Sequence, residues 1–183
     1  FHIEDQEFPK RCGHLDGKTL VSTAEMCQKI AAAKDALNDK DIVIIARTDA
    51  IAVEGFDAAI KRAKAYEAAG ADAIFVEAPI NLEQIEIIGK EVSVHPLINM
   101  FYSGKTPLVP LEDLKRMGYK IVIIPSDLQR AAIRAVELTL QEIKKTGNSA
   151  ALSGSLASFN DRELIVRTTD YLTLDENLGK RFK

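Results

Sequence analysis

Short apolar runs alternate along the chain with segments in which apolar residues recur every three or four positions. Continuous runs rich in β-branched residues are typical of strands covered on both faces, whereas the longer spacing marks one face of a helix. We expect strands at residues 1–3, 42–46, 73–76, 96–98 and 121–124. A predicted helix follows each strand, and this alternation indicates an α/β fold with a parallel sheet.

Several predicted helices have recognisable ends. Ser22 and Glu25 have the spacing of a capping box, and Asn81 is placed to open another helix. A glycine, the residue that best suits the position after a helix, follows each of the helices predicted at 56–69, 111–117 and 128–145. These signals support the division into βα units.

The chain changes character after Gly147. Residues 148–155 are small and polar, as in a linker. An amphipathic helix is predicted from Asp161 to about Tyr171, and residues 172–182 form a polar segment with scattered leucines. We therefore expect two parts, residues 1–147 and residues 148–183, of which the second is a C-terminal helical extension.

Polar side chains stand where the predicted strands end, and they are Glu4, Arg47, Asp49, Glu77, Asn99 and Ser126. A (β/α)8 TIM-type barrel keeps its chemistry at this end of its strands. No glycine-rich phosphate-binding fingerprint follows a strand, which disfavours a doubly wound nucleotide-binding sheet. A complete barrel has eight units in roughly 250 residues. We therefore expect residues 1–147 to be about the last five βα units of such a barrel, preceded by about three others.

Composition excludes some partners. The 183 residues carry a net charge of −3 and no cluster of basic residues with interleaved aromatics, so we expect no nucleic-acid binding. The apolar runs are of strand length, so no membrane association is expected. Cys12 and Cys27 do not form a disulfide framework, which favours a reducing, cytoplasmic location, with an organellar matrix as the alternative.

The loop after the first strand has the most distinctive chemistry, and it contains Lys10-Arg11-Cys12-Gly13-His14. Neighbouring cations stabilise a thiolate, so Cys12 is a candidate proton donor or acceptor near neutral pH. Glu4 and, more weakly, Asp5 offer the oxygen atoms that Mg²⁺ prefers. Cys27 lies on the apolar face of a predicted helix and is expected to be structural.

These residues resemble the isocitrate lyase/phosphoenolpyruvate mutase superfamily. The Lys10–His14 pentapeptide is similar to the mobile gating loop of its lyase branch. Ala46-Arg47-Thr48-Asp49-Ala50, Phe75-Val76-Glu77-Ala78 and Asn99 then match in the same order. The resemblance covers roughly residues 1–146 and is most similar to 2-methylisocitrate lyase, with 2,3-dimethylmalate lyase and oxaloacetate hydrolase as related types.

The resemblance implies roles for individual positions. Cys12 would be the general acid, in a closing loop with Lys10 and His14. Glu4 would contact Mg²⁺, or Mn²⁺ in its place, through water. The implied substrate-binding residues are Gly13, Arg47, Glu77, Asn99 and Arg130.

Plainer interpretations remain open for three of these residues. Arg47 and Asp49 could bond each other at the strand end. Glu77 could pair with an arginine for structural reasons. Arg130 could be a solvated residue of an ordinary amphipathic helix.

The resemblance implies a carbon–carbon bond lyase that cleaves a 2-hydroxy di- or tricarboxylate to pyruvate or glyoxylate plus a second acid. The chain departs from the 2-methylisocitrate lyases at Phe101-Tyr102, where they carry polar residues, and Arg162 is not in register with their late arginine. Oxaloacetate hydrolysis or decarboxylation and phosphonomutase chemistry are therefore alternatives within the superfamily, and a non-catalytic barrel or inactive fragment is the alternative of another class. The resemblance also implies a homodimer or homotetramer with helix exchange, and residues 1–183 alone are expected to lack turnover.

Overall fold

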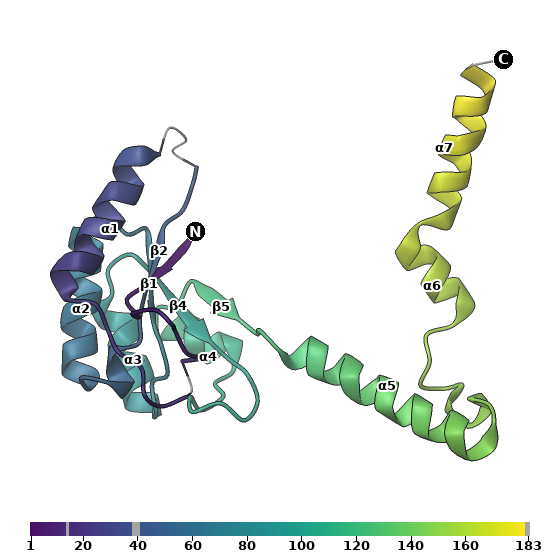
Figure 1. Cartoon of the computed structure of the whole chain (residues 1–183), viewed down its shortest axis with the longest axis horizontal. Helices are drawn as coiled ribbons and strands as arrows, with labels where there is room; N and C mark the ends of the chain where they lie inside the picture. Colours follow the sequence, from purple (N-terminus) through teal and green to yellow (C-terminus); the bar gives the residue numbers. More distant parts are fainter. Residues whose placement is uncertain (14, 38–40, 182–183) are drawn as a thin grey trace. The chain divides into compact units, whose positions relative to one another are not determined.

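The computed structural model describes residues 1–13, 15–37 and 41–181. Two compact units make up the chain, Phe1–Leu128 and Gln129–Lys183. The first contains the sheet and the helices beside it, and the second is helical (Figure 1). Each unit is described by itself.

The first unit is built on a parallel sheet. Its strands are β1 (His2–Glu4), β2 (Ile45–Thr48), β3 (Ala73–Val76), β4 (His95–Asn99) and β5 (Ile121–Ile123). The strands lie in the order in which they occur in the sequence, and each pairs with the next in parallel. A doubly wound sheet reverses its strand order at a switch point, whereas consecutive parallel order is that of a barrel wall.

Helices connect the strands and lie along one side of the sheet. They are α1 (Thr23–Ala36), α2 (Phe56–Ala68), α3 (Leu82–Glu91) and α4 (Leu111–Arg116), and a 3-10 turn, η1 (Ala50–Ala52), follows β2. Ser22 Oγ accepts a hydrogen bond from the N–H of Glu25 at 3.1 Å, and Asn81 Oδ1 accepts one from Gln84 at 2.8 Å, as the capping patterns predicted. The caps fix where α1 and α3 begin.

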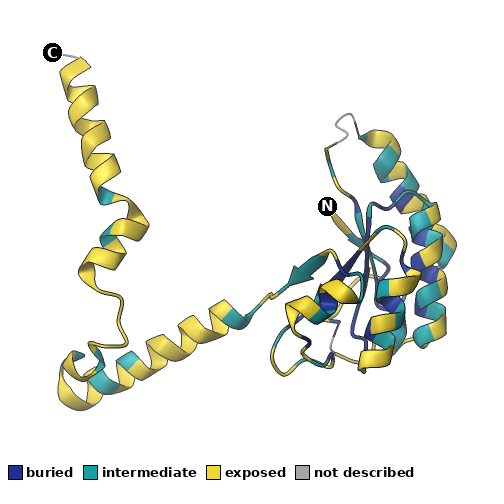
Figure 2. Cartoon of the chain, turned by 180° about the vertical axis from the view of Figure 1, so that it is seen from behind, coloured by how far each residue is buried: buried dark blue, intermediate teal, exposed yellow. Residues whose placement is uncertain are grey.

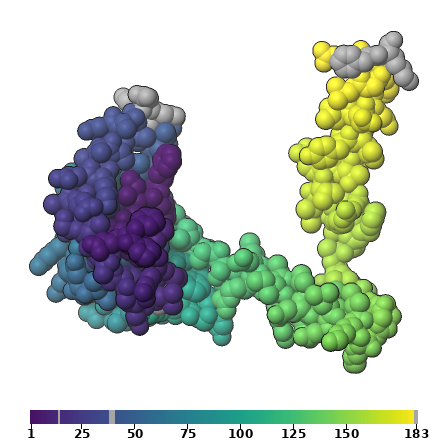
Figure 3. Space-filling view, viewed as in Figure 1, coloured from purple at the N-terminus to yellow at the C-terminus, as the bar shows by residue number. Residues whose placement is uncertain are grey.

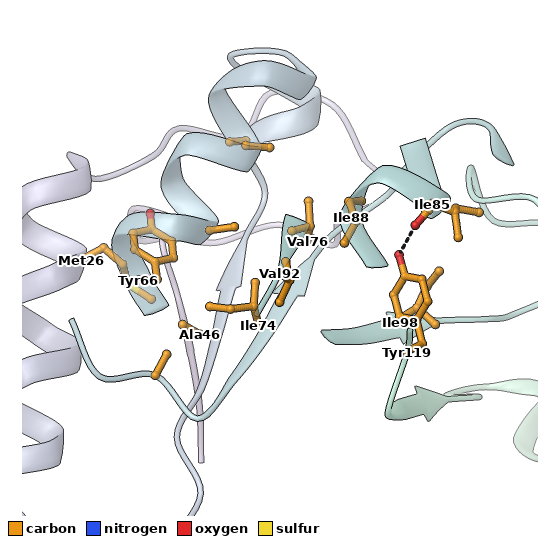
Figure 4. Packing of buried hydrophobic residues seen from close by; sticks show 14 of the residues in the cluster. Met26, Ala46, Tyr66, Ile74, Val76, Ile85, Ile88, Val92, Ile98 and Tyr119 are labelled. Carbon is orange, nitrogen blue, oxygen red and sulfur yellow. Dashed lines mark hydrogen bonds between the residues drawn. The ribbon is translucent and has the colours of Figure 1, made fainter. Parts of the chain in front are cut away.

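The core lies between the sheet and these helices. Alternate strand residues such as Ala46, Ile74 and Ile98 belong to one apolar cluster with Tyr66 of α2 and Ile85 of α3 (Figure 4). These five side chains are at most 1% exposed. The sheet face that the helices cover is therefore the packed one.

The opposite face carries a second row of side chains. Strand register places Glu4, Arg47, Phe75, Leu97 and Ile121 side by side across the sheet. Successive strand residues point to opposite faces, so this row lies away from the helix-covered core. The fold thus brings the polar ends of β1 and β2 together.

The observed β2 is displaced from the predicted strand at 42–46. It begins at Ile45 and continues through Arg47 and Thr48. The N–H of Ile44, just before it, donates to the Asp72 side chain at 2.8 Å. Apolar character alone therefore misplaced this strand, because register depends on pairing partners distant in sequence.

The second unit contains α5 (Asp127–Thr146), which begins just before the boundary, then η2 (Ala150–Leu152), α6 (Phe159–Val166) and α7 (Thr168–Arg181). No residue from 129 to 181 is buried, as the yellow and teal colouring of Figure 2 shows. No helix in the described part of the chain is both long and apolar enough to span a membrane.

Two predictions for the C-terminal part were wrong. The helix begins at Phe159 rather than Asp161, because Ser158 is its N-cap and forms a capping box with Asp161 in the third position. Arg167, in the left-handed conformation with φ 57°, ends α6. The next helix is α7, and it extends into the predicted polar segment through Arg181. The polarity of residues 172–181 therefore reflects their exposure to solvent and not irregular structure.

Candidate active site

The loop that carries Cys12 is fastened at both ends. Gln6 and Arg11 exchange two hydrogen bonds of 2.8 Å between the Gln6 amide and the Arg11 backbone. On the other side, Lys18 Nζ donates to the carbonyls of Gly13 at 2.6 Å and Leu15 at 2.5 Å. Figure 3 shows this N-terminal region, in dark purple, on the surface of the first unit. These contacts hold Cys12, an exposed free thiol, at the carboxyl end of the sheet.

Arg47 is surrounded by carboxylates. Its Nε and Nη2 atoms donate to the two oxygens of Asp49 at 2.9 and 3.0 Å. Its Nη1 lies 3.0 Å from Glu77 Oε2, and its Nε lies 3.4 Å from Glu4 Oε2. Burial lowers the pKa of Arg47, but the neighbouring carboxylates outweigh it and raise the pKa above its ordinary value. The guanidinium is thus permanently charged and fixed in one orientation.

Arg47 also contacts an aromatic ring. The guanidinium carbon of Arg47 lies 5.0 Å from the centre of the Phe75 ring, its neighbour in the strand row. That distance is within the range of a cation–π interaction. Phe75 therefore supports Arg47 from the next strand of the sheet.

Glu77 is 2% exposed and directly follows β3. Burial raises the pKa of its carboxyl group, and the nearby Arg47 opposes that shift. Ala78, the next residue, has φ 59°, a left-handed backbone that residues with a side chain seldom adopt. Such unusual backbone often occurs at functional sites.

These residues surround a pocket of about 510 Å³. Its lining consists of Glu4, Lys10, Arg11, Cys12, Gly13, Arg47, Glu77, Asn99, Phe101, Pro125 and Ser126. Lys10 Nζ lies 2.5 Å from Glu4 Oε1, so cations and carboxylates alternate around the wall. The side-chain oxygen of Asn99 is buried and has no hydrogen-bond partner among the described residues. A pocket with this lining can bind small anionic molecules and offer them a thiol proton.

Most of the predicted site residues meet in this pocket. They are Glu4, Lys10, Cys12, Gly13, Arg47, Glu77 and Asn99. Asp5 is not part of the lining, because both its oxygens accept hydrogen bonds in the interior. Arg130 lies on α5, in the second unit. His14 lies outside the described residues.

The plainer interpretations of Arg47 and Glu77 describe contacts that are present, since Arg47 bonds Asp49 and faces Glu77.

Two contributions to the site were not predicted from the sequence. Pro125, part of the lining, was not singled out. The role of Lys18 in holding the loop also had no local signal, because its partners are backbone carbonyls.

The sheet order and the pocket at the carboxyl ends of its strands define the first unit as part of a (β/α)8 barrel with a candidate active site. The family model described as phosphoenolpyruvate phosphomutase matches residues 1–144. The chain belongs to this family.

Relatives of known name are similar along nearly the whole chain. It is 40% identical over 179 residues to the 2-methylisocitrate lyase of Aeropyrum pernix, covering 98% of this chain and 58% of that protein. It is 43% identical over 178 residues to the 2-methylisocitrate lyase of Halalkalibacterium halodurans, covering 97% and 59%. The chain therefore spans somewhat more than half the length of these relatives.

Solved structures show the same architecture. A 2,3-dimethylmalate lyase superposes with a TM-score of 0.86 at 32% identity, covering 98% of this chain and 60% of that one. An oxaloacetate acetylhydrolase in complex with 3,3-difluorooxalacetate gives 0.87 at 31%, covering 97% and 60%. A phosphonopyruvate hydrolase in complex with oxalate and Mg²⁺ gives 0.75 at 29%, covering 96% and 61%.

Proposed function

We propose that the natural protein carrying this sequence is a carbon–carbon bond lyase. Its substrate would be a 2-hydroxy di- or tricarboxylate of the 2-methylisocitrate or substituted malate type, cleaved to pyruvate or glyoxylate and a second acid. The supporting observation is the lining of one pocket by the Cys12 loop and by Arg47, Glu77 and Asn99.

Arg47 is suited to hold a substrate carboxylate. A guanidinium has five N–H groups in a planar fork. Asp49 engages two of them and Glu77 faces a third, and the guanidinium lines the pocket where an anion would enter. Lys10 and Arg11 add positive charge to the same pocket.

Cys12 would complete the reaction as a proton donor. In a retro-aldol cleavage, the hydroxyl proton at C2 leaves to a base, the C2–C3 bond breaks, and a carbonyl forms at C2. The electron pair of the broken bond stays on C3, and the Cys12 thiol transfers its proton to that carbon. The thiolate then recovers a proton from solvent. Lys10 and His14 would belong to the loop that closes over this step.

Mg²⁺, or Mn²⁺ in its place, is the proposed metal. Among the described residues no three potential ligands converge on one point, so the fit rests on Glu4, whose carboxylate lines the pocket. Mg²⁺ keeps several of its waters, and Glu4 could accept a hydrogen bond from one of them. When bound, the ion would polarise the carbonyl oxygen of the product.

Phe101 helps to determine which substrates the pocket accepts. This aromatic residue lines the pocket and belongs to the Phe101-Tyr102 pair, at which the chain departs from the polar residues of the 2-methylisocitrate lyases. A flat apolar wall favours a substrate without a third carboxylate nearby, because a buried unpaired charge is costly. Oxaloacetate hydrolysis is therefore the second candidate, and the similarity to the oxaloacetate acetylhydrolase supports it.

We also propose a homodimer or homotetramer in which helices are exchanged between subunits. The apolar residues Ile133, Val136, Leu140 and Ile143 recur at helical spacing on α5 and are all exposed. An uncovered apolar stripe of this kind is typical of an interface. Arg130 lies on the same helix and would bind substrate in the assembled protein.

The test is turnover with defined substrates. The natural protein would be incubated with Mg²⁺ and 2-methylisocitrate, 2,3-dimethylmalate or oxaloacetate, and pyruvate, oxalate and acetate would be followed. Pyruvate from a 2-hydroxy acid supports the lyase, and oxalate with acetate from oxaloacetate supports the hydrolase. If none of the three compounds gave a product, both the lyase and the hydrolase proposals would be contradicted. The 183-residue chain, assayed in parallel, is expected to show no turnover.

A further inference from the structure

Asp5 is a fully buried carboxylate beside the pocket and does not line it. It directly follows β1 and is 0% exposed. Burying a charged group without partners is costly, so its surroundings must supply donors. Those donors connect it to the pocket arginine.

The two oxygens of Asp5 have different partners. Oδ2 accepts hydrogen bonds from the Tyr66 hydroxyl at 2.8 Å and from Arg62 Nη1 at 3.4 Å. Arg62 is itself fixed, because it donates to the Val21 carbonyl at 3.0 Å and to both oxygens of Glu54 at 2.8 and 2.6 Å. This oxygen therefore anchors Asp5 to α2.

The other oxygen faces the strand that carries Arg47. Oδ1 accepts a hydrogen bond from the backbone N–H of Asp49 at 3.0 Å. Asp49 has φ −99° and ψ 17°, in the sparsely populated bridge region where active-site residues often sit. Its side chain then forms the paired hydrogen bonds to Arg47. A continuous series of contacts thus runs from Arg62 and Tyr66 through Asp5 and Asp49 to Arg47.

We propose that Asp5 is a positioning residue that orients the Arg47 guanidinium through the backbone of Asp49, and that it does not bind metal. Arg62 and Tyr66 satisfy the other oxygen of Asp5 and stabilise the carboxylate in the interior. The consequence for substrate binding rests on the proposed function, because it assumes that Arg47 holds a carboxylate. The geometric part of the proposal does not depend on turnover.

The test measures the order of Arg47 itself. In the ¹⁵N-labelled 183-residue chain, the Nε–Hε signal of Arg47 would be assigned by its loss in Arg47→Lys, and its exchange with solvent measured. The decisive variant is Asp5→Leu combined with Arg62→Met, which removes the acceptor for Asp49 without leaving a buried charge unpaired. Its Arg47 Hε is expected to exchange roughly tenfold faster, as the loss of one supporting hydrogen bond allows.

Two further variants separate positioning from general stability. Asp5→Asn keeps an oxygen for the Asp49 N–H, whereas Tyr66→Phe removes the hydroxyl that donates to the other oxygen and accepts from Arg62 Nη1. Neither change removes the acceptor for the Asp49 N–H, so both should keep slow Arg47 exchange even where the thermal midpoint falls. Unchanged exchange in the double variant would overturn the proposal, as would equally fast exchange in Tyr66→Phe. If the natural protein shows no turnover but the exchange pattern holds, the proposed function fails and the positioning role stands.

Discussion

Gly13 lies against Glu77 and Arg47 with no room for a side chain. A Cβ built on Gly13 would be 2.5 Å from Arg47 Nη2, 2.7 Å from Glu77 Cδ and closer still to Glu77 Cγ. Since both partners are held by their own ion pair, neither can move aside cheaply. The Cys12 loop can therefore approach the pocket closely only through a glycine.

Gly13→Ala should separate the loop from the pocket. The added methyl group would displace the neighbouring Cys12 from its place in the pocket, and a displacement of about 1 Å can cost on the order of 10²-fold in rate. We expect kcat/KM of the natural protein to fall by about that factor. Gly154→Ala is the matched control, because a Cβ there meets nothing within 4 Å. Equal activity of the two variants would show that the loop does not need this contact.

Glu77 and Asp72 should affect stability with opposite dependence on pH. Burial raises the pKa of Glu77 above 4.5, so ionising this carboxyl group is less favourable in the folded chain than in the unfolded chain. The stability that Glu77 contributes relative to Glu77→Gln is fully present below that value and declines as pH rises through the folded pKa. Urea unfolding of the wild-type chain and the variant between pH 2 and 7 measures this difference.

Asp72 provides the comparison. Burial raises its pKa, but the Ile44 N–H and Lys34 outweigh burial and hold the pKa below 3.8. Its stabilisation relative to Asp72→Asn is therefore present above that value and lost as pH falls through the lower, folded pKa. The same pH trend in both pairs would contradict the assigned environments.

Gly89→Ala should destabilise the first unit even though alanine is the better helix former. Gly89 lies in α3, and a Cβ there would overlap the carbonyl oxygen of Met117 at the end of α4. Propensity favours alanine by about 1 kcal/mol, whereas overpacking against backbone costs about 1–3 kcal/mol. We expect a net loss of up to about 2 kcal/mol in the free energy of unfolding.

A glycine in another helix separates the effect of helix propensity from the effect of overpacking. Gly179 lies in α7 with nothing within 4 Å of a built Cβ. Gly179→Ala should raise helix content by circular dichroism without lowering the thermal midpoint. If Gly89→Ala were as harmless as Gly179→Ala, the close approach of α3 and α4 would be wrong.

Substitutions on the apolar stripe of α5 test the proposed assembly. Val136→Lys with Leu140→Lys would place two charges in the proposed interface, and we expect light scattering of the natural protein to show a smaller oligomer. Gln141, which is exposed on the same helix, is the control site, as Gln141→Lys. A natural protein that is monomeric before any substitution would contradict the assembly.

Fold class and most of the pocket could be predicted from the sequence because they rest on local patterns. Apolar runs and helix caps gave the order of the elements, and the polar residues that end β1, β2, β3 and β4 converge because parallel strands end at one edge. The matches to the superfamily then assigned roles that pattern alone could not.

Long-range contacts could not be predicted in the same way. Asp5 was a metal candidate because it stands beside Glu4, and its contact with Tyr66 depends on how α2 packs. The start of β2 depended on pairing with β1 and on the Asp72 side chain. The helical structure at 172–181 was missed because an exposed helix without buried residues lacks the apolar period used to recognise one.

The most direct test of the account compares Cys12→Ser with Cys27→Ser in the natural protein, with pyruvate release from the best 2-hydroxy acid as the readout. Cys12 lines the pocket, whereas Cys27 lies on α1, where its thiol faces the Ala65 carbonyl at 3.5 Å. A proton donor contributes about 10²–10⁴-fold, so Cys12→Ser should lose activity by that order and Cys27→Ser should keep it. Wild-type rates of pyruvate release from Cys12→Ser would contradict the proposed role of the loop and, with it, the central claim.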